Sequence, residues 1–402
     1  MNHLGWGLIN SLLLSTAFLL QPLWTAAAVT VVDEPVGNMQ FSDVMLAADA
    51  ERRQALVLWQ RKEPDGSASL RARVYSASER PLTDIYLVAT IDSTMEIETP
   101  VAAYDSQRDR YLVIYALSPK VEPRQWALYG RWISVEAGVM QISSPTLLAQ
   151  NAAGGVNQPK LIFDPASGTF MLAYRKYAAA EASVWVVRLN GDTFEPVSGP
   201  VVVETNDTPR PINWYILPEG KFLLGIFKWT KNQVTVGEIA ADLTVGEQKS
   251  VAMNVLDAAL TGAGKTPLLA WVVGNYDLRA VWLDAQGSAG TPFLLRAHPV
   301  GGRVILPAAG FDPAKGALVF WVEAVSDLHQ PWFAILPVPQ TDTRQIQPLE
   351  QTLNPGVDQP ISVACFSNGG CLVGTIDSTY GSAHVDLHRL GGIPVWLPLI
   401  EK

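Results

Sequence analysis

One phrase occurs twice in this chain. FDPASGTFMLAYRK begins at Phe163, and FDPAKGALVFWVE begins at Phe311. Each copy has a polar turn built from Asp, Pro and Gly, followed by an apolar run that ends in an aromatic residue. Pro fixes φ and Gly accepts a positive φ, so this turn suits a tight reversal between two strands. A recurring hairpin of this kind indicates a repeat architecture.

The same unit, two apolar runs joined by a polar turn, occurs seven times. The copies begin at Val44, Val101, Lys160, Ile212, Leu256, Ile305 and Ile361. An aromatic residue closes the second run in six copies: Trp59, Tyr115, Tyr174, Phe227, Trp271 and Trp321. The period is roughly 50 residues, which is the range of propeller blades rather than of helical solenoids. Asp164 and Asp312 recur in the turn, which marks them as structural, because a catalytic residue is normally needed once.

Each unit also contains a third and a fourth run, such as LRARVYSA from Leu70 and DIYLVAT from Asp84. The second runs, such as LVLW and LVFW, are apolar almost without alternation, which is typical of strands buried on both faces. Four short strands per unit is what a propeller blade needs. We therefore predict an all-β fold, a single β-propeller of about seven four-stranded blades. Six or eight blades is the alternative if a degenerate copy is misread.

The predicted domain covers residues 29–402, and the ring must close within it. The predicted blades span approximately 41–96, 97–150, 151–204, 205–254, 255–298, 299–352 and 353–402, with 29–40 joined to the last. The N-terminal run VTVVDE reads as a fourth strand. We predict that residues 29–34 complete the sheet of the last blade, beside or in place of the C-terminal run PVWLPLI. Shared closure of this kind removes free sheet edges.

Residues 1–28 carry the features of an export signal. An apolar run at 12–20 is followed by Ala26-Ala27-Ala28, which signal peptidase accepts, so we predict cleavage before Val29. The segment before the run has no Lys or Arg, a departure from the usual pattern. An uncleaved anchor is the weaker alternative, because Gln21-Pro22 interrupts the run short of the ~20 apolar residues that span a bilayer. We expect the mature chain to lie in the periplasm or outside the cell, with no transmembrane segment.

The amino-acid composition limits the kinds of partner that the protein is expected to bind. The formal net charge is −9, and the chain has no basic run, so it does not suit nucleic acid, whose phosphates require clustered Lys and Arg. Hydrophobic residues make up 48% of the chain and charged residues only 17%, which favours a large core and argues against disorder.

The two cysteines lie in VACFSNGGCLVG. If residues 367–369 form a three-residue hairpin loop, Cys365 lies opposite Cys371 and the two can bond. If Asn368-Gly369 forms a two-residue turn instead, Cys365 faces Leu372 and a bridge would be strained. We favour the Cys365–Cys371 disulfide, because an oxidising compartment lets it persist.

The unit resembles the degenerate propeller repeats of secreted bacterial proteins. In these a Pro opens the first strand, an aromatic-Asp turn follows, and an apolar run ends in Trp or Tyr. The third copy shows the pattern at Pro159, Phe163-Asp164 and Tyr174, and the sixth shows it at Phe311-Asp312 and Trp321. The fourth, fifth and seventh copies lack the aromatic-Asp pair. The resemblance covers nearly all of the mature chain and implies a fold and an address rather than a reaction.

Motifs that carry chemistry are few. TGAGKT at 261–266 lacks the first Gly of a phosphate-binding loop, and Pro267 follows where a helix should begin, so we interpret it as a hairpin turn. HVDLH at 384–388 is interpreted as a polar row facing the surface, because its two His lie too far apart along a strand for one metal. No zinc spacing, calcium loop or GxSxG elbow occurs in the sequence. We expect no metal and no cofactor, and no catalytic residue is assigned.

In a propeller, the loops between second and third strands share one face with the loops between blades. That face is predicted to display Arg61, Lys62, Lys176, Tyr177, Trp229, Tyr276 and Tyr380, the candidate residues for binding a ligand or partner. The favoured hypothesis is a non-catalytic binding or scaffold module for a protein or glycan. The alternative is a polysaccharide hydrolase or lyase with carboxylates at the mouth of the central channel, which rests on analogy between folds alone.

Overall fold

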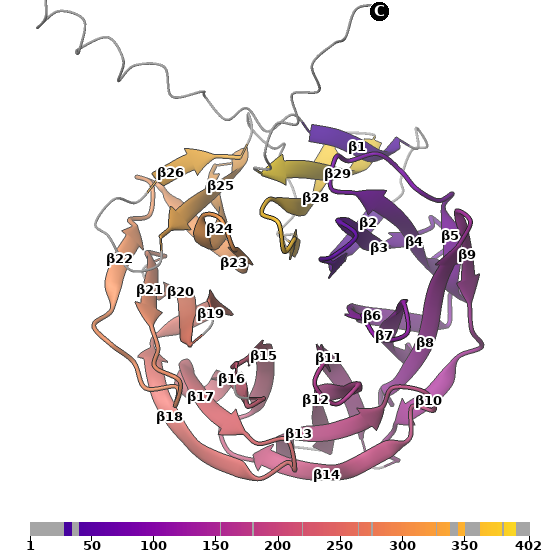
Figure 1. Cartoon of the computed structure of the whole chain (residues 1–402), viewed down its shortest axis with the longest axis horizontal. Helices are drawn as coiled ribbons and strands as arrows, with labels where there is room; N and C mark the ends of the chain where they lie inside the picture. The colour runs from indigo at the N-terminus through magenta and orange to yellow at the C-terminus, as the bar shows by residue number, and fades with distance from the viewer. Residues whose placement is uncertain are drawn as a thin grey trace, which may run out of the picture.

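A computed structural model describes residues 28–33, 40–152, 154–178, 181–218, 220–263, 265–274, 276–326, 328–337, 345–349, 362–379 and 382–390. They form seven antiparallel sheets arranged as a ring around a central axis (Figure 1). Within the described residues, the only helical element is the single 3₁₀ turn η1 (Trp229–Lys231). The predicted all-β, seven-bladed propeller is confirmed.

Each sheet is one blade, and its strands run outward from the axis in chain order. Blade 1 contains β2 (Gln40–Asp49), β3 (Gln54–Lys62), β4 (Ala68–Ser76) and β5 (Tyr86–Ile91). Blade 2 contains β6 (Met95–Asp105), β7 (Arg110–Pro119), β8 (Ala127–Glu136), β9 (Val139–Ile142) and β10 (Thr146–Ala149). Blade 3 contains β11 (Gly155–Asp164), β12 (Thr169–Ala178), β13 (Glu181–Asn190) and β14 (Pro196–Glu204). Blade 4 contains β15 (Pro209–Ile216), β16 (Phe222–Lys228), β17 (Gln233–Ile239) and β18 (Val245–Met253).

The remaining blades follow the same plan. Blade 5 contains β19 (Val255–Ala263), β20 (Thr266–Val273), β21 (Leu278–Trp282) and β22 (Phe293–Arg296). Blade 6 contains β23 (Gly302–Asp312), β24 (Gly316–Val325), β25 (Leu328–Leu336) and β26 (Gln345–Pro348). Blade 7 contains β27 (Ser362–Cys365), β28 (Cys371–Thr379), β29 (Ser382–Leu390) and, as its outermost strand, β1 (Ala28–Asp33) from the other end of the chain.

The ring closes through β1. This strand pairs antiparallel with β29, with Val29 opposite Leu387 and Asp33 opposite His384 (Figure 1). The prediction that the N-terminal strand completes the last blade is therefore confirmed. The C-terminal run PVWLPLI lies outside the described residues.

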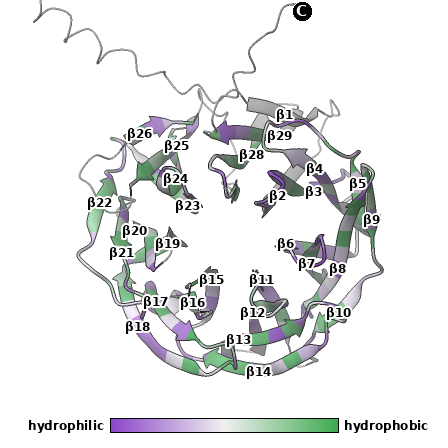
Figure 2. Ribbon diagram, in the orientation of Figure 1, coloured by the Kyte–Doolittle hydropathy of each residue, from purple (hydrophilic) through white to green (hydrophobic). Residues whose placement is uncertain are grey.

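The core consists of seven apolar clusters, one between each pair of neighbouring blades. The second strand of each blade supplies side chains to two clusters at once. In β3, for example, Val57 and Trp59 pack against blade 7, whereas Leu56 and Leu58 pack against blade 2. This explains the unbroken apolar runs, because successive side chains point to opposite faces and both faces are buried. Figure 2 shows hydrophobic segments in every blade and a mixture of hydrophobic and hydrophilic segments along the outer strands.

The aromatic residues that mark the period are part of these clusters. All six are buried, with at most 5% of their surface exposed: Trp59, Tyr115, Tyr174, Phe227, Trp271 and Trp321. The period of the sequence therefore reports the spacing of the interfaces between blades.

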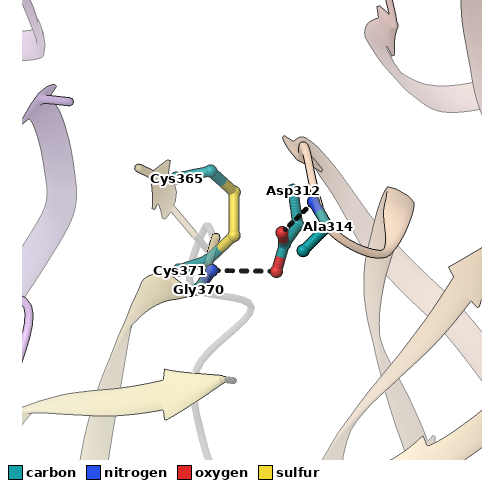
Figure 3. Close-up of a disulfide and its surroundings, with 5 residues drawn as sticks. All are labelled: Asp312, Ala314, Cys365, Gly370 and Cys371. Carbon is teal, nitrogen blue, oxygen red and sulfur yellow. Dashed lines mark hydrogen bonds between the residues drawn. A yellow bond between two sulfur atoms is a disulfide. The ribbon is translucent and has the colours of Figure 1, made fainter. Parts of the chain in front are cut away.

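The recurring aspartates are buried and structural, as predicted. Asp49, Asp105, Asp164 and Asp312 each accept a backbone N–H from the turn that follows them. In Asp312 one carboxylate oxygen accepts the Ala314 N–H at 2.8 Å, and the other accepts the N–H of Gly370 in the next blade at 2.9 Å (Figure 3).

The two cysteines form the predicted disulfide. Cys365 lies directly opposite Cys371 across the β27–β28 hairpin, and their sulfur atoms are bonded (Figure 3). Phe366 N–H donates to Gly370 carbonyl at 3.0 Å, so the loop contains three residues rather than two. The loop geometry that makes the bridge possible is the one found.

Two further interpretations have different outcomes. TGAGKT joins β19 to β20 and is a hairpin connection, as predicted. The interpretation of HVDLH as a surface row is wrong for His388, which is fully buried and lies 2.9 Å from Thr375 Oγ1 through its Nε2. β1 covers β29, so β29 is an interior strand with one end of the chain outside it. In the part of the chain that the structure describes, no helix is long and apolar enough to cross a membrane.

Removal of the Asp312 carboxylate is expected to destabilise the fold. Asp312→Ala leaves two backbone N–H groups without their acceptor, one of them in another blade, and should lower the free energy of unfolding by about 2–4 kcal/mol. Asp242→Ala is the matched control, because exposed Asp242 accepts hydrogen bonds from Thr244 within its own turn. Urea unfolding measures both variants, and equal losses would refute the role of Asp312 between blades.

Candidate functional site

In each blade, the loop between the second and third strands lies on the same face of the propeller as the connections between blades. We call this face the upper face. Asn151, in the connection from blade 2 to blade 3, donates its side-chain N–H to the Tyr177 carbonyl at 2.9 Å. Val255, which begins blade 5, donates its N–H to the carbonyl of Asn232 in the β16–β17 loop at 2.8 Å. These contacts place both sets of loops together.

The inner strands bring polar side chains to this face through a repeated irregularity. In six blades the pairing of the first and second strands shifts register near the start of the first strand, as in a β-bulge. The shifts lie between Ser42 and Met45, Glu98 and Val101, Asn157 and Lys160, Pro211 and Asn213, Val255 and Asp257, and Ile305 and Ala308. A bulge re-aims the side chains beside it, so these positions form a ring around the upper end of the central axis.

The predicted candidates in blades 1 and 3 lie in different surroundings. Arg61 forms an ion pair with Glu63 of its own turn at 2.7 Å, whereas exposed Lys62 lines a pocket. The Lys176 ammonium lies 4.8 Å from the centre of the Trp185 ring. Tyr177 is half-buried, and the Arg175 guanidinium lies 5.4 Å from the centre of its ring.

The predicted candidates in blades 4 and 5 are exposed aromatic residues. Trp229 lies on η1, packs edge-on against Phe227 with ring centroids 5.7 Å apart, and carries the Arg210 guanidinium 5.5 Å above its ring. Tyr276 lies in the β20–β21 loop with a positive φ of 66°. Tyr380 lies outside the described residues. The candidates therefore do not form one site but belong to separate parts of the upper face.

A polar pocket of about 580 Å³ lies between blades 1 and 2. Its charged lining residues are Asp43, Lys62, Glu63, Glu96, Glu98, Lys120 and Arg124, and Trp126 contributes an aromatic wall. Several of these groups are paired within the pocket: Arg124 contacts Glu96 at 2.7 Å, and Lys120 Nζ donates to the Gly66 carbonyl at 2.8 Å. The pocket can hold a polar ligand of small size through hydrogen bonds to both signs of charge.

Glu98 is a carboxyl of this pocket whose pKa is shifted. Burial raises its pKa above the usual range, and the carboxylates of Asp43 and Glu96 add to the rise. A hydrogen bond from Asn157 Nδ2 to Glu98 Oε2 at 3.2 Å acts in the opposite direction, as does Arg175. Proton transfer is chemistry that a carboxyl with a raised pKa can perform.

The central channel contains a cavity of about 360 Å³. Most of its lining is apolar or small, with Val44, Leu46, Ala102, Leu161, Ala259 and Ala308 among the residues around it. Its charged lining residues are Asp43, Lys160 and Asp257. The channel wall is therefore mostly apolar, with two carboxylates and one ammonium group among its lining residues.

A groove of about 600 Å³ lies between blades 4 and 5 on the upper face. Met253 and Leu256 line it, and so do Asn232 and Gly274, which belong to the loops of Trp229 and Tyr276. Two of the lining side chains are exposed, Met253 by 55% and Leu256 by 40%. Two side chains of the bordering loops are exposed as well, Trp229 by 58% and Tyr276 by 38%. Exposed apolar side chains gathered in this way indicate an interaction surface.

Several of these residues were not among the sequence candidates: Asp43, Glu98, Lys160, Arg175, Arg210, Met253, Leu256 and Asp257. A signal for two of them was present. At the first position after the bulge, three of the six copies carry an apolar or small residue, namely Met45, Val101 and Ala308, whereas the others carry Lys160, Asn213 and Asp257. A charged residue at a position that is apolar in other copies needs a reason other than packing.

No family model matches this chain, and no curated protein matches it. Among solved structures, the BP39L lectin from Burkholderia pseudomallei is 13% identical, with a TM-score of 0.57 over 88% of this chain and 99% of the lectin. A sialidase from Trypanosoma rangeli is 9% identical with a TM-score of 0.49, over 88% of this chain and 55% of its own. Prolyl oligopeptidase B from Galerina marginata is 12% identical with a TM-score of 0.46, over 85% of this chain and 47% of its own.

This chain therefore spans about half the length of the two enzymes. At these identities the likeness shows the fold alone. The chain is a seven-bladed β-propeller protein, and its resemblance to degenerate propeller repeats holds at the level of the fold.

Glu98→Gln is expected to stabilise the protein at neutral pH. Burial raises the folded-state pKa of Glu98 above its unfolded value, so keeping it ionised costs folding free energy at high pH, and this cost vanishes as the pH falls through the folded pKa. The melting temperature of the variant should exceed that of the wild type at pH 7, and the difference should shrink towards pH 4. Glu247→Gln, at an exposed position on β18, is the control. A gain that is the same at both pH values would contradict the assignment.

Proposed function

We propose that the protein is exported and acts as a non-catalytic binding or scaffold module that holds a protein partner on its upper face. The observation that carries the proposal is the exposure of Met253 and Leu256, which line the groove between blades 4 and 5, together with the exposure of Trp229 and Tyr276 in the two loops that border it. Aromatic residues and Met are enriched where proteins bind each other, and aromatic residues often supply most of the binding energy. The aliphatic side chains favour a polypeptide over a glycan, because a glycan gains mainly from aromatic faces and hydrogen bonds.

Export is supported by two features. The first 28 residues have the pattern of a signal peptide, and the disulfide between Cys365 and Cys371 is a bond that persists in oxidising compartments. The acidic net charge of −9 agrees with a partner other than nucleic acid.

Capture of the partner from the native envelope tests this proposal. The tagged chain is expressed with its leader, and the recovered protein should begin at Val29 and bring down a protein in stoichiometric amount. Trp229→Ala and Tyr276→Ala should each reduce that capture at least about tenfold, since interface aromatics often contribute 2 kcal/mol or more. Leu87→Ala, an exposed apolar residue on the outer strand β5, is the control and should leave capture unchanged.

Either of two results would overturn the protein-partner proposal. One is equal capture by the wild type and the Trp229 and Tyr276 variants. The other is an enrichment of glycans in place of any protein.

The polar pocket favours a second candidate, a hydrolase or lyase acting on polysaccharide. Asp43 and Glu98 line the same pocket, and the Asp43 charge contributes to the raised pKa of Glu98. A carboxyl with a raised pKa beside an ionised one is the arrangement that glycoside cleavage uses. Glu98 would then donate a proton to the leaving oxygen, and Asp43 would act as base or nucleophile.

Turnover on a panel of polysaccharides, followed through new reducing ends or unsaturated products, tests this candidate. Glu98→Gln and Asp43→Asn should each lower kcat at least 100-fold, the usual contribution of a general acid or base. Glu63→Gln changes a carboxylate of the same pocket that is paired with Arg61, and should retain activity. An absence of turnover by the wild-type protein, or turnover that survives both substitutions, would exclude it.

A further inference from the structure

Three cationic side chains of blades 3 and 4 lie near the upper mouth of the channel, where Arg210 contacts Asp257 of the cavity wall and its charge acts on both Lys160 and Arg175. Lys160 follows the bulge of β11 and lines the channel cavity. Arg175 lies on β12, opposite Asn157 of β11. Arg210 lies on β15 of the next blade, opposite Phe227, and its guanidinium lies 4.8 Å from the centre of that ring. In a chain with a net charge of −9, such a group of cations is unusual.

Three partly buried cations elsewhere in the protein contact a carboxylate directly. Arg108 lies 2.6 Å from Asp192, Arg296 lies 2.5 Å from Glu323, and Lys228 lies 2.5 Å from Glu204. These pairs offset the cost of removing a charge from water.

The three cations at the channel mouth lack such contacts. Arg175 Nε is buried and has no hydrogen-bond acceptor among the described residues. Lys160 Nζ makes no hydrogen bond to a carboxylate within that same part of the chain. For Arg210, the carboxylate oxygen in range is Asp257 Oδ1, 3.9 Å away, which is beyond hydrogen-bonding distance. Donors on all three side chains are therefore available to a ligand.

The electrostatics of the mouth agree with this arrangement. Burial lowers the pKa of Lys160, and the Arg210 cation lowers it further. Burial also lowers the pKa of Arg175, and Arg210 again adds to the effect. These cations are thus partly dehydrated and repel one another, a cost that a bound anion would relieve.

The acidic groups around the mouth offset only part of this cost. Asp257 and Asp43 act to raise the pKa of Lys160, and Glu98 acts to raise that of Arg175, but burial outweighs them and both pKa values stay lowered. The Asp257 carboxylate accepts the N–H of Ala258 at 2.9 Å, and Glu98 accepts the side-chain N–H of Asn157 at 3.2 Å. Burial raises the pKa of both carboxyls. Asp43, which also acts on Lys160, comes from blade 1 on another side of the cavity.

We propose that Lys160, Arg175 and Arg210 form a binding site for one oxyanion group, a carboxylate, sulfate or phosphate, at the upper mouth of the channel. The two guanidinium groups supply planar pairs of N–H donors that match an oxyanion, and the lysine supplies a point charge from the cavity below. The site borders the exposed apolar surface, because Arg210 lies over Trp229. It goes beyond the proposed function, since it requires no protein partner.

Titration with small anions tests the site on the full mature chain. Sulfate, phosphate and acetate are added at constant ionic strength with chloride as the balancing ion, and binding is followed by calorimetry and by the melting temperature. A bound anion should raise the melting temperature in a saturable way, by mass action. The relative response to the three anions distinguishes a carboxylate site from a sulfate or phosphate site.

Variants assign the effect to these residues. Lys160→Met, Arg175→Gln and Arg210→Gln should each weaken binding by about tenfold or more, the usual effect of losing a charge-assisted hydrogen bond. Lys160→Arg keeps the charge and should retain binding. Arg279→Gln, an exposed cation that lines the groove between blades 4 and 5, is the matched control and should bind like the wild type.

The melting temperature without anion separates a binding defect from a folding defect. Removal of a buried, unpaired cation should leave this temperature unchanged or raise it, while the response to anion is lost. The proposal is overturned if chloride gives the same response as the three anions. It is also overturned if Arg279→Gln weakens binding as much as Arg210→Gln does. Neither outcome depends on whether a protein partner is captured through Trp229 and Tyr276.

Discussion

Each blade of this protein is stable only between two others. Alternate side chains of the second strand of every blade pack into two different apolar clusters, and each cluster combines residues of two neighbouring blades. Burial of a large aromatic side chain contributes roughly 3 kcal/mol to stability. For Trp59 and Trp321 this contribution comes from contact with a neighbouring blade. Stability is therefore a property of the closed ring.

The ring of blades closes with strands from both ends of the chain. An open ring would leave one face of two blades in water and one sheet edge unpaired, and either would expose apolar side chains or backbone groups. Pairing of β1 with β29 solves both problems, since the last blade then takes its outer strand from the beginning of the chain. The contact of Asp312 with Gly370 and the disulfide in the next hairpin reinforce the same region between blades 6 and 7 (Figure 3).

The candidate sites arise where a repeated position carries a residue that the repeat does not need. The bulge near the start of each inner strand recurs in six blades, but Glu98 and Lys160 occur there once each. The upper-face loops differ similarly in length and content, and the loops of blades 4 and 5 that border a groove carry exposed Trp229 and Tyr276. The repeat builds a rigid frame, and the departures from it supply the chemistry.

The amino-acid sequence determined the period, the four strands per blade, the structural role of the recurring aspartates and the hairpin disulfide. These features depend on residues close together in the chain, where turn chemistry and side-chain alternation act directly. The interpretation of HVDLH failed for His388 because its strand lies inside the sheet of blade 7, with β1, a strand more than 350 residues away in the chain, paired on its outer side. Tertiary structure likewise decided which charged groups lie near one another. It places Asp43 and Glu98 in the lining of one pocket, and it brings Arg210 close to Lys160 and Arg175. Such groups combine residues of two blades, and the contacts between faces of adjacent sheets set which side chains lie near one another.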